Sequence, residues 1–352
     1  MWRVVGALVW AACIAGCGAP RDVENACRAR LAEPRAIAPR LRNLVLITVD
    51  GVRAEDVLGE GARAGLPNLY RVIDGGVALA SIAASGPNFV SLPGYREIFT
   101  GRRAGGCQSN ECGPLDEPTL LDELRAELPA GDVAAIASWE TLERAAAITP
   151  RAIAISTGRH GGAGRERLRV GGDASARLDA GAAAGAWPGH WDYRPDAFTG
   201  ELALAYLEAR RPRVLYVGLG DTDELAHRGD RAGYLAALAA ADALVGRISQ
   251  KLDSLGYDRA ETLFIVTSDH GRGAGFRDHG RAQPESRRVW LAASGARLAP
   301  RGVLAAGPER RLADLAPTLR LYFGLGADDS PRAGAPIPEL LPAVTFSASR
   351  DR

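Results

Sequence analysis

The sequence has almost no net charge, a single lysine, and few histidines and cysteines. Its 43 basic and 42 acidic side chains nearly cancel, which argues against a protein that follows nucleic-acid phosphates through an overall basic surface. Lys251 is the only lysine, and no internal repeat is apparent. The rest is ordinary, since 352 residues with 47% hydrophobic and 24% charged content suit one large or two small globular domains.

The first 17 residues are typical of a secretory signal. Arg3 precedes an apolar run over residues 4–16, which is too short for a membrane span but suits the core of a signal peptide. The run ends in Ile14-Ala15-Gly16-Cys17, which resembles the lipobox of bacterial lipoproteins, where the cysteine is lipidated. We therefore expect an exported periplasmic or cell-surface lipoprotein, anchored to a membrane through Cys17. A plain cleaved signal is the alternative, and residues 18–42 are expected to form a tether.

Three cysteines follow this leader: Cys27, Cys107 and Cys112. The last two lie in a loop-like stretch, where a short disulfide is plausible in an oxidising compartment. Cys27 would then be unpaired. A zinc site is the rival interpretation, but no second cysteine or histidine pair follows at the required spacing. We favour the disulfide.

Strand-like apolar runs alternate with helical patterns along the chain. This alternation predicts an α/β fold with a central, mostly parallel sheet and helices on both faces. The expected strands are 44–49, 133–137, 152–155, 214–217, 263–267 and 289–292, and the expected helices are 119–128, 198–210 and 231–255. We predict one catalytic domain over 43–330, with 158–196 as an insertion near the site and 331–352 as a C-terminal tail.

Polar residues follow three of these strands where each strand ends. Asp50 ends the first run, Asp221 and Asp223 follow the run at 214–217, and Asp269-His270 follows the run at 263–267. Ligands of such sheets gather beyond the carboxyl ends of the strands. Asp223 and His227 are four residues apart, a spacing that lets both side chains reach one metal. With His279 nine residues after His270, the pattern indicates a metal site.

These segments resemble the alkaline phosphatase superfamily, which includes alkaline phosphatases, nucleotide pyrophosphatase/phosphodiesterases, cofactor-independent phosphoglycerate mutases and sulfatases. The resemblance extends from about Leu44 to Leu325. It rests on the order and spacing of residues 46–51, 223–227, 267–271, His279 and 313–319.

The resemblance implies two divalent ions about 4 Å apart. Asp50, Asp269 and His270 would hold one of them. Asp223, His227 and His279 would hold the other. Mixed Asp and His ligands favour zinc, with manganese and iron as alternatives.

Two serines compete as the nucleophile. Ser85 begins Ser85-Gly86-Pro87-Asn88, which resembles the nucleophile motif of nucleotide pyrophosphatases. Ser91, however, precedes Thr100-Gly101 by the nine residues that this family keeps, so we select Ser91 as nucleophile and metal ligand, although Gly94 replaces the family's asparagine. Ser91 is also expected to cap a helix, whose free N–H groups attract an oxyanion.

The same resemblance implies a phosphoesterase that hydrolyses mono- or diesters through a phosphoserine at Ser91. Asn88 and Arg96 are near enough in sequence to bind nonbridging oxygens. The expected substrate is a small-molecule, glycan or lipid phosphoester. The alternatives are a sulfate or phosphonate ester hydrolase and a non-catalytic binding lipoprotein. Arg96 falls one position late for a type I sulfatase motif, and the stretch between Thr100 and Val214 is too short for a mutase cap domain.

Overall fold

Nine strands form a single sheet in the computed structural model, which describes residues 42–103, 105–304 and 307–342. The predictions for Cys17, Cys27 and nearly all of the tether lie outside these residues. Along the sheet the order is β4-β3-β5-β1-β6-β7-β2-β8, and β9 pairs with β2. The strands are β1 (Asn43–Val49), β2 (Gly76–Ala83), β3 (Val133–Ala137), β4 (Ala154–Thr157), β5 (Val214–Leu219), β6 (Thr262–Thr267), β7 (Arg288–Gly295), β8 (Gly302–Leu304) and β9 (Arg310–Arg311).

The predicted, mostly parallel sheet is confirmed. Only β7 runs against its neighbours, β6 and β2, and every other pair in the described sheet is parallel. Five of the six predicted strands overlap their observed positions closely. The strand expected at 152–155 begins two residues later, because Pro150–Ala152 forms a 3-10 turn.

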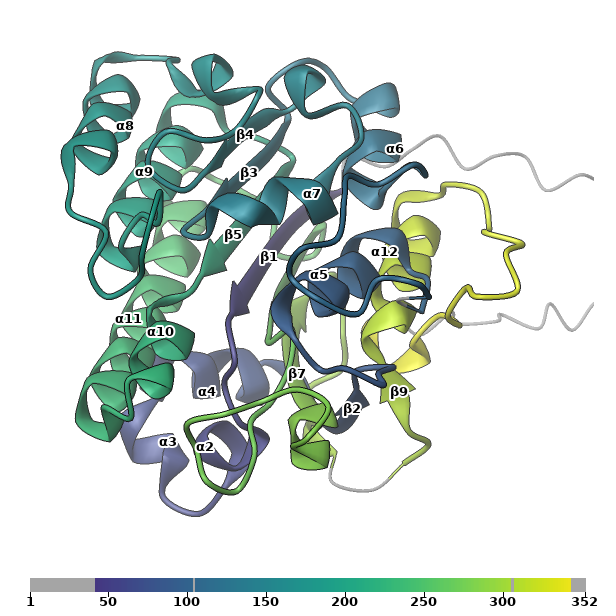
Figure 1. Cartoon of the computed structure of the whole chain (residues 1–352). Coiled ribbons are helices and arrows are strands. Elements are labelled where there is room, and N and C mark those ends of the chain that lie inside the picture. Colours follow the sequence, from purple (N-terminus) through teal and green to yellow (C-terminus); the bar gives the residue numbers. More distant parts are fainter. Residues whose placement is uncertain (1–41, 104, 305–306, 343–352) are drawn as a thin grey trace, which may run out of the picture. The chain divides into compact units, whose positions relative to one another are not determined.

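Helices cover both faces of the sheet, as predicted (Figure 1). Successive residues of a strand point to opposite faces, so Leu44 and Leu46 join one hydrophobic cluster while Val45 and Ile47 join the other. The first cluster contains residues of α5 (Ser91–Thr100), α6 (Leu120–Glu127), α7 (Glu143–Ala146) and α12 (Leu315–Phe323). The second contains residues of α2 (Ala54–Leu58), α4 (Pro67–Asp74), α8 (Gly172–Ala183), α9 (Asp196–Arg210), α10 (Asp221–His227) and α11 (Arg231–Ser254). A short helix, α3 (Ala62–Gly65), precedes α4.

The long helix α11 is apolar enough, by length and composition, to cross a membrane. Its apolar face is used inside the fold, however, because Tyr234, Leu238 and Ile248 are buried in the second cluster. The helix also carries Arg247 and Lys251, which form ion pairs with α9. We therefore describe α11 as a core helix.

Two segments that the sequence sets apart from the central sheet contribute buried side chains. In the predicted tail, 331–352, Ile337 and Leu340 are fully buried and the Ile337 N–H donates to Thr318. The segment 158–196, predicted as an insertion, contains α8 and places Leu168 and Leu178 in the second cluster. It is thus partly built into the core.

The disulfide between Cys107 and Cys112 is present, with a Cα–Cα distance of 5.7 Å. It closes a short loop beside the start of α5, where Asn110 accepts a hydrogen bond from the Leu92 N–H. The disulfide expected from the sequence is therefore found.

Candidate metal centre and nucleophile

The carboxyl ends of β5, β1 and β6, which are neighbours in the sheet, carry the acidic and imidazole side chains of the candidate site. Asp50 directly follows β1, and Asp269-His270 lies just beyond β6. Helix α10 begins two residues after β5 and carries Asp223 and His227. Parallel strands deliver these side chains to one edge of the sheet, as the sequence predicts.

The first group, which we call the inner cluster, consists of Asp50, Asp269 and His270. All three are buried, with Asp50 4% exposed and the other two 0%. His270 Nε2 lies 3.3 Å from Asp50 Oδ1 and 3.4 Å from Asp269 Oδ2. Both of these carboxylate oxygens are buried without a hydrogen bond among the described residues. Such orphaned acceptors carry a large desolvation cost, which a bound cation would offset.

Burial dominates the electrostatics of the inner cluster. It raises the pKa of Asp50 to about 7, and repulsion from Asp223 adds to the shift. It also raises the pKa of Asp269 well above its ordinary value, with the charge of Asp50 adding to the effect. Burial lowers the pKa of His270 to about 4. Each shift disfavours the charged form of its group, as expected when ionisable groups are taken out of water.

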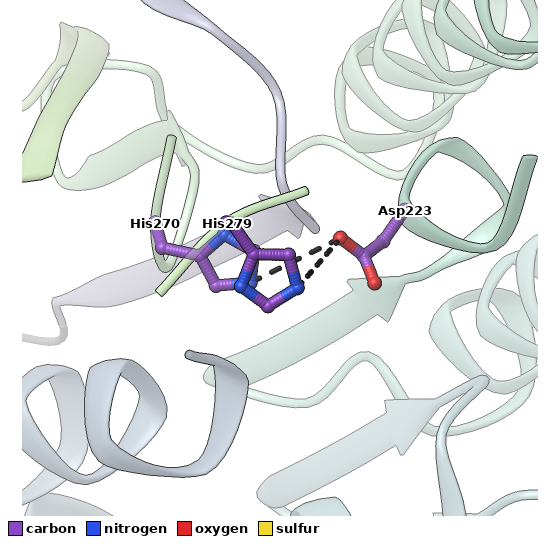
Figure 2. Close-up of side chains that lie close together, drawn as sticks. All are labelled: Asp223, His270 and His279. Atoms are coloured by element: carbon purple, nitrogen blue, oxygen red, sulfur yellow. Dashed lines mark ion pairs between the residues drawn. The ribbon is translucent and has the colours of Figure 1, made fainter. Parts of the chain in front are cut away.

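The second group, the outer cluster, consists of Asp223, His227 and His279. His227 Nε2 lies 3.1 Å from Asp223 Oδ2 and 2.9 Å from His279 Nε2. His279 Nε2 and His270 Nε2 lie 3.7 Å and 4.0 Å from Asp223 Oδ1. Figure 2 shows the rings of His270 and His279 stacked beside this carboxylate, with centroids 4.0 Å apart. The two clusters are therefore adjacent and share the space around His270.

The outer cluster differs from the inner one because its carboxylate has positive partners. Burial by itself would raise the pKa of Asp223. Electrostatic attraction to Arg272, followed by that to His279, instead holds this pKa well below its usual range. The hydrogen bond to Asp223 raises the pKa of His227. Burial lowers the pKa of His279 to about 3, and repulsion from His270 adds to this shift.

The donor atoms suit a divalent metal. His270 Nδ1 lies 2.8 Å from the Gly271 carbonyl and His279 Nδ1 lies 3.0 Å from the Phe89 carbonyl. A carbonyl only accepts, so each Nδ1 donates and each Nε2 is left as a lone pair facing the carboxylates. Ligand atoms of Asp50, Asp269 and His270 lie within 4.8 Å of one another, as do those of Asp223, His270 and His279. The first set is the inner cluster, and the second combines Asp223 and His279 of the outer cluster with His270, so the two sets share one imidazole. The residue types suit a divalent metal in each set.

Ser91 lies beside the inner cluster. Its Oγ is 3.3 Å from His270 Nε2, and the residue is 5% exposed. The expected role as a helix cap is not observed, because Val90 occupies the cap position and α5 begins at Ser91. The hydroxyl is thus directed to the cluster rather than to the helix end.

Gly94 explains how α5 reaches this position. A Cβ at residue 94 would lie 2.3 Å from the Asp269 carbonyl oxygen, a separation that no side chain tolerates. Glycine therefore lets the first turn of α5 pack against the backbone of the metal-site strand.

The other three sequence candidates have different partners. Ser85 donates through Oγ to Glu97 at 3.0 Å. Asn88 donates to the Gln108 carbonyl at 2.6 Å and accepts from the Arg281 N–H at 2.7 Å. Arg96 donates to the carbonyls of Gly113 and Arg144. The structure does not bring Arg96 to the clusters, and it leaves the Asn88 amide engaged with a backbone carbonyl.

Sequence reasoning missed two residues of the site. The Tyr95 hydroxyl donates to Asp50 Oδ2 at 3.0 Å and is buried. Its signal was available, because residue i+4 lies on the same helix face as Ser91. Arg272 donates to the Asp223 carboxylate. Only its position two residues after His270 pointed to the site.

A network of hydrogen bonds fixes the start of α10. Asp196 accepts from the N–H groups of Gly220 and Asp221, at 2.8 Å and 2.9 Å, and from Ser138 Oγ at 2.6 Å. Tyr193 donates to Asp221 at 2.7 Å. Asp221 is thus part of this network, whereas Asp223 points to the clusters, in agreement with the choice made from its spacing to His227.

The segment 158–196 reaches the far end of α10 through Arg228. The Arg228 guanidinium donates to the Pro188 carbonyl, with Nη2 at 2.6 Å, lies 3.0 Å from His190 Nε2, and stacks 4.4 Å from the Trp187 ring. Trp187 and Trp191 are 65% and 88% exposed. The segment therefore contacts Arg228, the residue that follows His227 of the outer cluster.

Comparison with known proteins agrees with this picture. No curated protein matches the sequence. Residues 192–325 match the family model described as Metalloenzyme superfamily. This match includes all the residues of the outer cluster together with Asp269 and His270.

Several solved structures share the fold. One is a phosphonate monoester hydrolase of Agrobacterium radiobacter, with 19% identity and a TM-score of 0.58 over 85% of this chain and 77% of that one. Another is a putative sulfatase from Bacteroides thetaiotaomicron, with 14% identity and a TM-score of 0.61 over 86% and 75%. A third, solved with its substrate D-glucosamine-2-N,6-O-disulfate, has 15% identity and a TM-score of 0.60 over 86% and 82%. The predicted alkaline-phosphatase-like fold and the resemblance to that superfamily are confirmed.

Proposed function

We propose that this protein is a metal-dependent phosphoesterase of the alkaline phosphatase superfamily in which Ser91 is the nucleophile. The observation that carries the proposal is the position of the Ser91 hydroxyl, 3.3 Å from His270 Nε2 and beside two buried carboxylates with orphaned oxygens. A serine at the start of a helix, next to a metal-binding cluster, is well placed for attack on a tetrahedral oxyanion ester.

The residues divide the chemistry as follows. Ser91 Oγ attacks phosphorus, a bond forms between them, and the bond to the departing alcohol oxygen breaks. Water then hydrolyses the phosphoserine and regenerates Ser91. Tyr95 orients Asp50 through its hydrogen bond, and the Nδ1 bonds of His270 and His279 direct each Nε2 toward the clusters. Divalent ions, for which we propose zinc, would supply the charge that favours loss of the Ser91 proton and offsets charge on the ester.

A sulfate or phosphonate ester hydrolase is the second candidate, because the structures that share the fold include a putative sulfatase and a phosphonate monoester hydrolase. We favour the phosphate ester because the chain lacks the spacing between nucleophile and arginine that is typical of type I sulfatases. Arg96 falls one position late, and its guanidinium donates to the backbone carbonyls of Gly113 and Arg144.

The test is a side-by-side assay of p-nitrophenyl phosphate, bis-p-nitrophenyl phosphate and p-nitrophenyl sulfate with the metal-loaded protein. We expect turnover of a phosphate ester that Ser91→Ala reduces by at least about 100-fold. Ser85→Ala is the matched control, because Ser85 is bonded to Glu97, and it should retain activity. Preference for the sulfate would favour the second candidate. Absence of turnover with every ester, in a protein that still binds metal, would favour the non-catalytic lipoprotein.

For location, we propose an exported lipoprotein anchored through Cys17. The support is the apolar run that ends in Ile14-Ala15-Gly16-Cys17. Cys17→Ser should release the protein from the membrane fraction and abolish the mass increment of acylation. Membrane retention of this variant, together with an unmodified wild-type mass, would contradict the anchor.

A further inference from the structure

Arg272 is a buried cation beside the outer cluster. Its side chain is 0% exposed, and its Nη2 donates to both the carboxylate and the backbone carbonyl of Asp223. Its Nη1 donates to the carbonyls of Phe276 at 3.3 Å and Arg277 at 2.9 Å. Because the loop's own carbonyls hold the guanidinium, its position does not depend on Asp223 alone.

The chain makes room for this contact at Gly51. Residue 51 has φ +61°, and a Cβ there would lie 2.4 Å from Asp223 Oδ1 and 3.0 Å from Arg272 Nη2. A side chain at this position would separate the carboxylate from the guanidinium. Glycine is therefore required both for the left-handed backbone and for the approach of the two groups.

The inner cluster has no equivalent of Arg272 among the residues that the structure describes. Asp50 Oδ1 and Asp269 Oδ2 are both buried without a hydrogen bond there. The groups that donate hydrogen bonds to the other oxygens of these two carboxylates are neutral, namely the Tyr95 hydroxyl, the Gly51 N–H and the Ser268 hydroxyl. The carboxylates of the inner cluster thus have no cation bonded to them among the described residues, although the charge of Arg272 also reaches Asp50. The carboxylate of the outer cluster has the guanidinium bonded to it.

We infer that Arg272 makes the two metal positions unequal, so that the inner cluster binds its ion first and tightly while the outer cluster binds a second ion more weakly. An ion entering the outer cluster meets the fixed positive charge of the guanidinium and competes with it for Asp223 Oδ1. An ion entering the inner cluster meets no such competitor and satisfies two orphaned oxygens. The inference rests on the proposed metal-dependent function.

The experiment is a calorimetric titration of Zn²⁺ into metal-free protein prepared with a chelator. The wild type should take up two equivalents in two separate steps, with dissociation constants that differ by about 10- to 100-fold. Arg272→Met, which keeps an unbranched apolar side chain and removes the charge, should tighten the second step by a similar factor. The first step should change little.

Arg281→Met is the matched control, because Arg281 is an exposed residue of the same loop. It loses the same charge and should leave both steps as in the wild type. Two further variants assign the steps without relying on Arg272→Met to fold. Asp269→Asn should abolish the tight step, whereas Asp223→Asn should abolish the weak one and keep the tight one.

Two equal steps in the wild type, an unchanged second step in a folded Arg272→Met protein, or loss of the tight step in Asp223→Asn would each overturn the inference. These outcomes leave the proposed function intact, because metal still binds. Absence of any Zn²⁺ uptake would instead overturn both the inference and the metal-dependent function.

Discussion

Two groups of buried carboxylates lie near the ends of the central strands, and they differ in how their oxygens are satisfied. In the inner cluster, Asp50 and Asp269 each keep one buried oxygen without a hydrogen bond. In the network at the start of α10, Asp196 accepts from Ser138, Gly220 and Asp221. The protein therefore leaves acceptor oxygens of the inner cluster without a hydrogen-bond donor, whereas it provides donors to the Asp196 carboxylate.

The pKa shifts of the carboxylates do not distinguish these two groups. Burial raises the pKa of Asp50 to about 7 and that of Asp221 to about 8. Perturbed carboxylates are enriched at functional sites, but structural networks perturb them too. The distinguishing feature is the pair of orphaned oxygens beside His270, since buried acceptors that lack protein donors gain most from a bound cation.

The largest effect is expected from Asp269→Asn, which removes an inner-cluster carboxylate. Phosphoesterase activity should fall by at least about 100-fold, beyond the loss typical of partners outside the ligand shell. Elemental analysis should show the loss of one metal equivalent. Asp221→Asn is the same substitution in the other group and should keep both metal and activity. Equal losses in the two variants would remove the distinction between the groups.

The next effect concerns metal and stability. Zn²⁺ at about 100 times its dissociation constant should add about 2.7 kcal/mol to the free energy of unfolding, because the ion binds only the folded cluster. Thermal unfolding across a Zn²⁺ series measures this increase. Asp221→Asn should show the full increase and Asp269→Asn only a reduced one. An Asp269→Asn protein that gains as much as the wild type would place the tight site elsewhere.

A smaller effect is expected in the satisfied network. Asp196→Ala leaves the N–H groups of Gly220 and Asp221 without their acceptor, which should cost about 1–3 kcal/mol in urea-induced unfolding. Asp196→Asn keeps one acceptor oxygen and should lose less. Metal uptake should survive in the folded fraction. A stability unchanged from the wild type would show that α10 is held in place by other contacts.

The smallest effect is expected from Arg96→Met, which removes a cation that lies outside both groups. Its guanidinium donates to Gly113 and Arg144 rather than to the clusters, so kcat/KM should change by less than about threefold. Steady-state kinetics with the preferred ester measures this ratio. A tenfold fall in kcat/KM that comes from a rise in KM alone would indicate that Arg96 binds the substrate.

Most of the fold could be predicted because its central strands are buried on both faces. Such strands appear as continuous apolar runs, and Leu44 to Val49 and Leu263 to Thr267 were recognised in this way. Strand β2 was not foreseen, because Gly76–Ala83 is rich in small residues that suit several local structures. The late start of β4 reflects a proline turn that apolar content alone does not reveal.

The candidate site could be predicted where the spacing between two residues in the sequence determines the direction of their side chains. Asp223 was selected over Asp221 because four residues bring it to the same side of a helical turn as His227, and the structure places both in the outer cluster. Arg96 was predicted to bind the ester because it lies close to Ser91 in sequence, but the structure directs its side chain to the carbonyls of Gly113 and Arg144. On an α-helix, residue i+4 is rotated about 40° from residue i and residue i+5 about 140°, so Tyr95 faces the site from α5 and Arg96 does not. The contact of Arg272 with Asp223 depends on a loop path that no spacing encodes.

Gly94 has a consequence for how this protein could be altered. Because the first turn of α5 touches the Asp269 carbonyl with no side chain between them, residue 94 sets the distance between Ser91 and the inner cluster. Even alanine would force the helix outward, and Ser91 would move with it. Engineering of this site should therefore keep Gly94 and vary the exposed segment around Trp187 and Trp191, where the chain can change without moving Ser91 relative to the inner cluster.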